Sequence, residues 1–382
     1  MTDSPDQKAP SLTHIGTLDG IRGIAVLLVI CFHFSWSFMA NSPGSHTVKR
    51  LFPVGWVGVD LFFVLSGYLI TRGLVAPSSR PKGERLKLFW IRRFLRIFPL
   101  YYAVILVGTV VALATHGRPP ELSYWLYVQN YALAFDPDPE RWTSHLWSLA
   151  IEEQFYFVWP LVALLVSRKR LLPLIVALFL FGVVGRAGLV FATHHWDVLT
   201  TAKLAYRATP TRMDGLLLGA AIATMGHEPE AWLSRAWLKV RRPLLFVSAL
   251  VFLALVLVTR GFLNEDRRVI VLGYPVIATL FACVVSLGVD GQLPKRVTRF
   301  FESKPLVACG RVSYGMYMFH WPLVALGIPF FKHAETYAFG PSALALGFAC
   351  TLGGILVTYV AAEVSFRAFE TPFLNLKSRF HG

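Results

Sequence analysis

Charged residues are scarce in this sequence of 382 residues, and acidic residues are scarcer than basic ones. Lys, Arg, Asp and Glu together make up 15% of the chain, while hydrophobic residues make up 55% and aromatic residues 14%. Soluble globular domains carry about 25% charged residues. The composition therefore excludes a soluble globular protein and predicts an all-α polytopic membrane protein.

Cysteine is also rare, and the N-terminal segment does not have the pattern of a secretory signal. The four cysteines lie in apolar stretches without paired spacing, which indicates neither a disulfide framework nor a metal site. The polar N-terminal segment lacks the basic start, apolar run and small-residue cleavage site of a secretory signal. We expect residues 1–14 to form a disordered cytoplasmic tail.

Apolar runs long enough to cross a hydrocarbon core of about 30 Å recur along the rest of the chain. We count ten and expect them to form one transmembrane domain over residues 15–370, with a second cytoplasmic tail at 371–382. The predicted spans lie near residues 15–38, 54–76, 97–115, 146–167, 171–193, 206–226, 243–260, 268–290, 305–328 and 341–366.

The distribution of basic residues predicts the orientation. The two tails and the even-numbered loops hold more than twice as many Lys and Arg residues as the odd-numbered loops. Short basic loops stay in the cytoplasm, so we expect both termini there, in a multi-pass protein of a bacterial inner membrane. Topology thus accounts for the net charge of +15, and no nucleic-acid partner is expected.

Two connecting segments differ from simple loops. Residues 81–98 alternate basic and apolar side chains, which predicts an interfacial helix leading into the third span. Residues 119–147 are rich in aromatic side chains and end at Trp147. An aromatic belt at the membrane boundary and a surface for a sugar-like or macrocyclic acceptor are both compatible with this pattern.

The first span contains the two most informative residues, Arg22 and His33. They are eleven positions apart, which on a helix places them roughly 20° apart on one stripe and roughly 16 Å apart along the axis. Ionisable groups at membrane depth usually face a protein interior or a wet cavity. We predict that His33 is a general base, because imidazole can take a proton from a hydroxyl near neutral pH.

Acidic residues in two further spans are candidates for the same site. Asp60 in the second span could orient an imidazole or pair with Arg22. The alternative interpretation is that Asp60 is an ordinary residue at the start of a helix near the membrane surface. Glu152 and Glu153 are adjacent in the fourth span, and we favour Glu153, with Arg186 or Arg212 as a partner or with His33 as the group it assists.

A group of arginines lies at the cytoplasmic boundary. Arg93 and Arg96 share one helix face, and Arg72 is close in the predicted topology. Guanidinium groups suit phosphates, so these three residues are candidates to bind the phosphates of a coenzyme A donor. Contact with anionic lipids explains the same spacing equally well.

Several polar residues of other spans are candidate contacts for a substrate. His320 is a possible second imidazole, although a packing or hydrogen-bonding role fits its position beside Pro322. The candidate substrate-binding residues are Trp147, His145, Arg212, Tyr314 and His320.

Six blocks in order along the chain resemble the acyltransferase-3 family of polytopic membrane O-acyltransferases. The blocks are LDGIRGIAVLLVICFHF, GVDLFFVLSGYLI, RRFLRIFPLYY, HLWSLAIEEQFYFVWPL, TRMDGLLLGAAIA and GRVSYGMYMFHWP. The resemblance implies transfer of an acyl group, commonly acetyl from coenzyme A, to a hydroxyl of a glycan, a lipid-linked saccharide or a macrolide. It implies essential roles for Arg22 and His33 and a place in the site for Arg93, Arg96 and Glu153.

These observations predict an O-acyltransferase that uses acyl-coenzyme A, most simply acetyl-coenzyme A, and no metal. Some members of the resembled family carry an additional esterase-like domain after the membrane part, and this sequence stops at Gly382 without one. A transporter that moves a solute or an acylated product along a polar path is the alternative function, because buried His, Arg and Glu residues also mark proton-coupled transport.

Overall fold

The protein is helical throughout the part that the structure describes. The computed structural model describes residues 15–39, 52–136, 142–193, 198–335 and 341–380. Within these ranges there are α-helices, short 3₁₀ and π turns and no strand. The predicted all-α fold is therefore confirmed, whereas the predicted tail at residues 1–14 lies outside the described residues.

The first half of the chain forms the following elements. They are α1 (Gly16–Met39), the 3₁₀ turn η1 (Phe52–Val57), α3 (Gly58–Val75), α4 (Lys82–Ala114), α5 (Leu122–Trp125), α6 (Gln129–Phe135), η2 (Ser144–Leu146), α7 (Trp147–Leu165) and α8 (Arg168–Ala192).

The second half continues the helical order. It consists of α9 (Val198–Arg207), η3 (Thr209–Thr211), α10 (Asp214–His227), α11 (Trp232–Val258), the π turn η4 (Val269–Gly273), α12 (Tyr274–Val289), α13 (Lys295–Phe301), α14 (Lys304–Arg311), α15 (Ser313–Glu335), α16 (Pro341–Ser365), the π turn η5 (Phe366–Glu370) and α17 (Thr371–Ser378).

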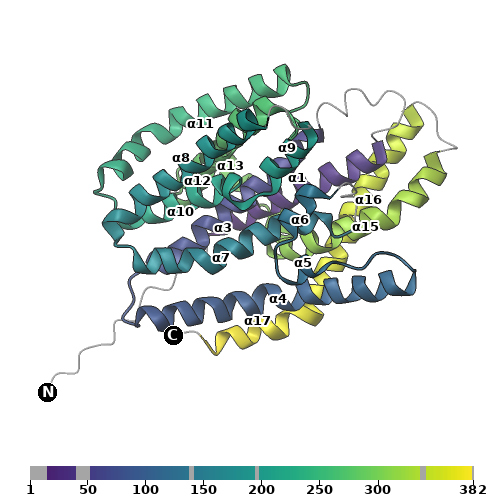
Figure 1. The fold of residues 1–382 in the computed structure, drawn as a ribbon, viewed down its shortest axis with the longest axis horizontal. Coiled ribbons are helices and arrows are strands. Elements are labelled where there is room, and N and C mark those ends of the chain that lie inside the picture. Colours follow the sequence, from purple (N-terminus) through teal and green to yellow (C-terminus); the bar gives the residue numbers. More distant parts are fainter. Residues whose placement is uncertain (1–14, 40–51, 137–141, 194–197, 336–340, 381–382) are drawn as a thin grey trace.

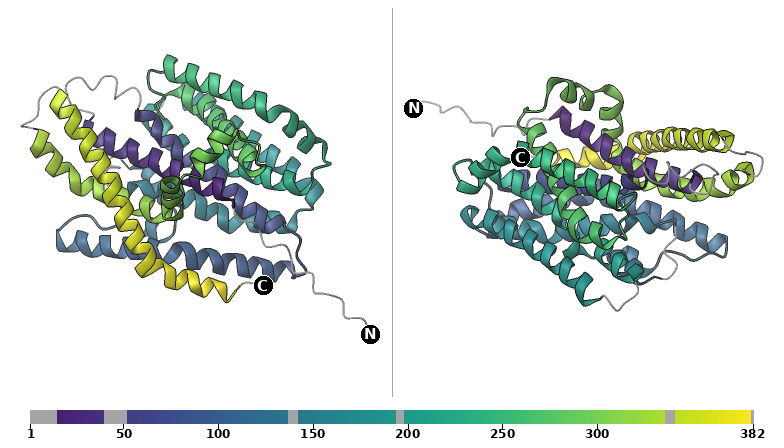
Figure 2. Two further views of the ribbon diagram at one scale, coloured as in Figure 1. Left: turned by 180° about the vertical axis from the view of Figure 1, so that it is seen from behind. Right: turned by 90° about the horizontal axis from the view of Figure 1, so that it is seen from above.

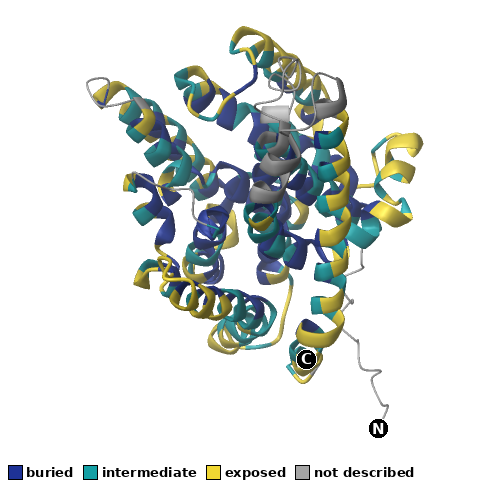
Figure 3. Cartoon of the chain, turned by 90° about the vertical axis from the view of Figure 1, so that its right-hand side faces the viewer, coloured by how far each residue is buried: buried dark blue, intermediate teal, exposed yellow. Residues whose placement is uncertain are grey.

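The helices form one bundle around α1 and α3. α1 packs against α3, α12, α14, α15 and α16, while α3 packs against α7, α10 and α12. α4 and α17 lie along one edge of the bundle, and α8 and α11 lie along the opposite edge (Figures 1 and 2). Buried residues fill the interior between these helices, whereas exposed residues lie mostly on the outer helices (Figure 3).

Eight helices in the described part are long and apolar enough to cross a membrane, which supports a multi-pass membrane protein but not the predicted count of ten. The predicted span at 206–226 is broken into α9, η3 and α10. Pro210 lies in the break, and proline disfavours helical geometry in the residue before it. The predicted span at 305–328 is divided between α14 and α15 at Val312.

Two boundaries also differ from the sequence-based expectation. The predicted interfacial helix at 81–98 is not a separate element, because it continues through Pro99 as the single helix α4. A proline inside a membrane helix is tolerated when neighbouring groups satisfy the freed backbone. Most of the predicted tail at 371–382 is helix α17, which packs along α4 (Figure 1).

Glycines allow α3 and α10 to cross at very short distance. A Cβ atom built on Gly67 of α3 would lie 1.9 Å from the carbonyl oxygen of Leu216, and one on Gly219 of α10 would lie 2.0 Å from that of Val64. Close helix contacts through small residues are the usual way in which membrane helices associate. Gly215 and Gly219 of α10 thus lie directly against α3, and this contact positions the polar residues of both helices.

Gly67→Ala is expected to destabilise the protein strongly, because the added methyl group collides with the backbone of α10, which cannot move as a flexible side chain can. Gly73→Ala on the same helix is the matched control, since a Cβ there has no heavy atom within 4 Å. Thermal unfolding of both purified variants in detergent measures the difference. Equal unfolding temperatures would contradict the role assigned to this crossing.

Candidate active site

A central cavity of about 100 Å³ lies among α1, α3, α4, α7 and α15. One end is strongly polar, with three guanidinium groups beside a carboxyl group. The other end holds hydroxyl groups of α7 and α15. The polar lining residues are Arg22, Ser66, Arg93, Arg96, Ser148, Glu152, Tyr156, Ser313, Tyr314 and Tyr317.

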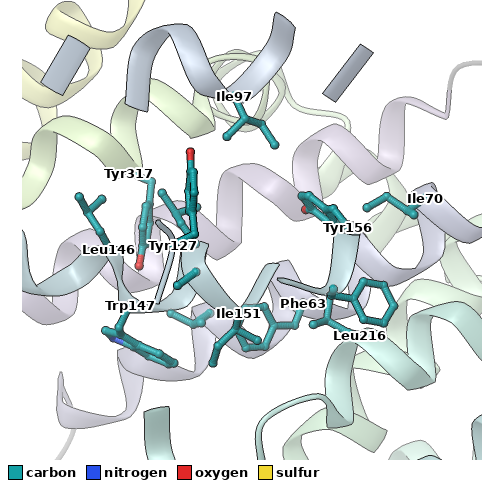
Figure 4. Packing of buried hydrophobic residues seen from close by; sticks show 14 of the residues in the cluster. Phe63, Ile70, Ile97, Tyr127, Leu146, Trp147, Ile151, Tyr156, Leu216 and Tyr317 are labelled. Atoms are coloured by element: carbon teal, nitrogen blue, oxygen red, sulfur yellow. The ribbon is translucent and has the colours of Figure 1, made fainter. Parts of the chain in front are cut away.

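Contacts with neighbouring helices hold the polar end in place. Arg22 Nη1 lies 3.5 Å from Asp19 Oδ1, one turn earlier on α1. The guanidinium of Arg93 lies over the ring of Tyr156, 5.1 Å from its centroid, and the Tyr156 hydroxyl is hydrogen bonded to Ser66. Figure 4 shows Tyr156 and Tyr317 on the two sides of the buried cluster, with Ile97 of α4 above the space between them.

A second cavity, of about 430 Å³, adjoins the first through shared arginines. Arg93 and Arg96 line both cavities, and all the charged residues that line the second one are basic. We call it the basic cavity; its charged lining residues are Arg80, Arg85, Arg92, Arg93, Arg96 and Lys377. A cavity of this charge is suited to a ligand that carries several phosphates.

A third, mostly apolar hollow of about 870 Å³ lies between α4, α7 and α17. Its walls include Phe94 and Phe157, whose side chains are exposed on the outside of the bundle, and Arg93 and Tyr156 connect it with the central cavity. Glu153 also lines it. We call this hollow the lateral groove.

Three histidines form a cluster next to the hydroxyl end of the central cavity. His33 Nδ1 lies 2.9 Å from His320 Nε2, and the ring centroid of His145 lies 5.0 Å from that of His320. Tyr317 lies between this cluster and the cavity. Its hydroxyl is 2.6 Å from Ser148 Oγ and donates to the carbonyl oxygen of His145 at 2.7 Å, and its ring centroid is 5.3 Å from that of His320.

The hydrogen bonds determine where the protons of the neutral rings lie. His320 Nδ1 is 2.7 Å from the carbonyl oxygen of Tyr317. A carbonyl oxygen can only accept, so His320 carries its proton on Nδ1 and accepts at Nε2. His33 must then donate from Nδ1, which leaves a lone pair on its Nε2. This arrangement makes His33 Nε2 the basic atom of the pair.

His145 completes the cluster without a comparable hydrogen bond. Its side chain is buried, and neither ring nitrogen has a hydrogen-bond partner within the described ranges. Those ranges also contain no group of three His, Cys, Asp or Glu side chains arranged to hold a metal ion.

Asp60 does not contact Arg22 or His33, contrary to one of the roles considered for it. Its carboxylate forms a buried ion pair with Arg212, with Oδ1 and Nη1 3.0 Å apart. Aromatic rings, among them those of Trp147 and Tyr274, surround this guanidinium, with centroids 5.8 Å and 4.4 Å from its carbon. Trp147 and Arg212 therefore contact each other, and neither lines the central cavity.

Glu153 and Arg72 also lie outside the central cavity. Adjacent residues on a helix point about 100° apart, so Glu152 lines the central cavity while Glu153 faces the lateral groove. The expected partners of Glu153 are occupied, because Arg186 pairs with Asp214 at 2.8 Å and Arg212 pairs with Asp60. Arg72 lies on the face of α3 away from Arg93 and Arg96 and lines a fourth cavity.

The other candidate residues lie in the wall of the central cavity or beside it. Tyr314 lines the central cavity and donates from its hydroxyl to the carbonyl oxygen of Ile97 at 2.8 Å. His145 and His320 belong to the histidine cluster rather than to the cavity wall. Our sequence reasoning missed Tyr156 and Lys377, because a tyrosine in an aromatic run and a lysine in an expected tail carry no distinctive spacing.

The ion pair of Asp60 provides a test of what holds this region together. Asp60→Asn is expected to lower the free energy of unfolding by about 3 kcal/mol, because it leaves the Arg212 guanidinium buried without a counter-charge. The control is Asp266→Asn, which removes the partner of Arg268, a cation whose side chain is 53% exposed, and is expected to cost less than about 1 kcal/mol. Chemical unfolding of both variants measures the difference, and similar losses would refute the assignment.

Fold and site together define a helical membrane protein in which arginines and a carboxyl group line connected cavities and a cluster of three histidines lies beside them. Residues 15–362 match the model of a family described as an acyltransferase domain. The chain belongs to this family, acyltransferase 3, which confirms the resemblance seen in the six sequence blocks.

Two similar proteins illustrate the relationship. Peptidoglycan O-acetyltransferase OatA of Listeria monocytogenes is 28% identical over 95% of this chain and 56% of its own length. O-acetyltransferase OatA of Staphylococcus aureus is 29% identical over 96% of this chain and 58% of its own length. The chain thus spans just over half the length of these relatives. No solved structure matches it.

Proposed function

We propose that this protein is a membrane O-acyltransferase that transfers an acetyl group to a hydroxyl of a carbohydrate. The family and the names of the two relatives support this reaction class, and the name of the Listeria protein supports peptidoglycan or a related glycan as the acceptor. The protein acts in the bacterial cytoplasmic membrane with both termini in the cytoplasm, as the distribution of its basic residues suggests.

The donor in this proposal is acetyl-coenzyme A, and the observation that carries it is the sharing of Arg93 and Arg96 between two cavities. The basic cavity offers six cationic side chains to the phosphates of coenzyme A. The shared pair then lies at the passage into the central cavity. A donor anchored by its phosphates can extend its thioester past this pair toward Arg22.

The transfer step requires a base for the acceptor hydroxyl. The acceptor oxygen attacks the thioester carbonyl carbon, a C–O bond forms and the C–S bond breaks. His33 Nε2 takes the proton of the hydroxyl, and coenzyme A leaves as its thiolate and is then protonated. Arg22 lies at the donor end and helps to anchor the donor there, while His320 keeps His33 in the basic tautomer.

The two ends of the site receive different substrates in this proposal. Arg22 and His33 are roughly 16 Å apart along α1, a distance that the long flexible arm of coenzyme A can cover. Donor binding therefore belongs to the arginine end and acceptor activation to the histidine end. Glu152 balances the charge of the arginines, and the lateral groove, with Glu153 in its wall, joins the central cavity at the arginine end.

The hydrogen-bonded pair of His33 and His320 predicts that substitutions reduce acetyl transfer to different degrees. His33→Ala is expected to abolish transfer in a folded, membrane-inserted protein. His320→Gln should retain more transfer than His320→Leu, because a glutamine oxygen can still accept from His33 Nδ1 whereas leucine cannot. Radiolabel passing covalently from acetyl-coenzyme A to peptidoglycan fragments measures this order. Full activity of His33→Ala would remove His33 from the mechanism, and uptake of label without covalent transfer would indicate a transporter.

Donor binding provides a separate test. Arg96→Gln is expected to weaken coenzyme A binding about tenfold or more, because it removes a charged hydrogen-bond donor to phosphate. Arg235→Gln is the control, since Arg235 pairs with Glu230 at the surface and lines none of the cavities described above. Isothermal titration of the purified proteins with coenzyme A compares them. Unchanged affinity in Arg96→Gln would argue against the basic cavity as the donor site.

A further inference from the structure

The cavity that Arg72 lines is separate from the proposed reaction site. It has a volume of about 400 Å³ and lies among α3, α10, α11 and α12. None of its lining residues lines the central cavity, the basic cavity or the lateral groove. Its polar lining residues are Tyr68, Arg72, His227, Ser234, Trp237, Arg241, Ser286 and Asp290.

Arg241 is held in the wall of this cavity by fixed contacts. Its side chain is 4% exposed, it forms an ion pair with Asp290, and its Nη1 donates to Ser286 Oγ at 2.9 Å. Trp237 donates from Nε1 to the same hydroxyl oxygen at 3.0 Å. The carboxylate that balances Arg241 is 41% exposed, so solvent weakens its field inside the cavity.

Two further residues make the cavity suitable for an anion. Arg72 adds a second positive charge from the last turn of α3. The hydroxyl of Ser234 is buried, with the residue 2% exposed, and it has no hydrogen-bond partner in the part of the chain that the structure describes. Buried hydroxyl groups are normally hydrogen bonded, so Ser234 indicates a partner that completes the site.

Groups that can only donate hydrogen bonds outnumber groups that can only accept them in the wall of this cavity. Two guanidinium groups, an indole N–H and hydroxyl groups face a single carboxylate, and the cations exceed the anion by one charge. A phosphate group presents several acceptor oxygens and negative charge, and guanidinium forks match its geometry.

We propose that this cavity is a second phosphate-binding site, distinct from the proposed donor site and located on the other side of α3. The phosphate belongs either to a small phosphorylated compound in the cytoplasm or to a lipid headgroup. The volume leaves room for an organic group beside the phosphate, as is usual for ligand pockets of this size.

The test uses inorganic phosphate and the full chain in nanodiscs of zwitterionic phosphatidylcholine. All proteins carry Arg96→Gln, which weakens the proposed donor site, so that the remaining phosphate binding reports on the second site. Adding Arg72→Gln is expected to weaken phosphate binding about tenfold or more in isothermal titration. Adding Arg235→Gln, which changes a surface cation that lines none of the four cavities, should leave the affinity unchanged, and adding Arg80→Gln reports on any phosphate still bound in the basic cavity.

The outcomes separate the proposed site from the donor site. Loss of phosphate affinity on Arg80→Gln but not on Arg72→Gln would overturn the proposal, since the phosphate would then occupy the basic cavity. Ser234→Ala, which removes only a hydroxyl, is expected to weaken binding in the same direction as Arg72→Gln. The Ser234→Ala variant can replace Arg72→Gln in this test if the arginine variant fails to fold.

A second measurement distinguishes the two sources of phosphate. Thermal unfolding is compared in phosphatidylcholine nanodiscs with free phosphate and in nanodiscs containing phosphatidylglycerol. Stabilisation by free phosphate that depends on Arg72 identifies a soluble ligand, whereas Arg72-dependent stabilisation by phosphatidylglycerol alone identifies a headgroup. The absence of both effects would overturn the proposal.

Discussion

An arginine inside a hydrocarbon layer must find a counter-charge or water, and this requirement organises the bundle. Arg186 and Arg212 satisfy it with Asp214 and Asp60, in two ion pairs whose side chains are almost completely buried. The pairs join α8, α10 and α3 at the point where the backbone breaks between α9 and α10. The broken helix therefore has a physical role, since it brings a guanidinium to the start of α3.

Arg22 of α1 is placed differently. Its contact with Asp19 is longer, at 3.5 Å, and its side chain lines a cavity with Arg93 and Arg96. Three guanidinium groups beside Glu152 leave this end of the cavity positively charged. Such a surplus is costly in a membrane unless an anionic ligand or water enters, and the adjoining basic cavity offers the route for such a ligand.

At the histidine end, the direction of the hydrogen bonds, and not charge, determines which ring nitrogens carry protons. A backbone carbonyl of α15 determines the tautomer of His320, and His320 in turn determines that of His33. Tyr317 connects this relay to the cavity through contacts with Ser148 and the His145 carbonyl. In the proposed reaction, electrostatic binding of the donor and proton transfer from the acceptor are therefore separated along one helix.

The all-helical membrane architecture, the family and most residue types of the site could be predicted from the amino-acid sequence, because hydropathy, charge and short motifs are local properties. The packing of the helices was needed to show which acid faces the cavity, since Glu152 and Glu153 point about 100° apart and distant helices fill the space on each side. It likewise decided the partner of Asp60 and the cavity of Arg72. Pairing at membrane depth depends on which helices come within a few ångströms of each other, and spacing along one chain segment carries no such information.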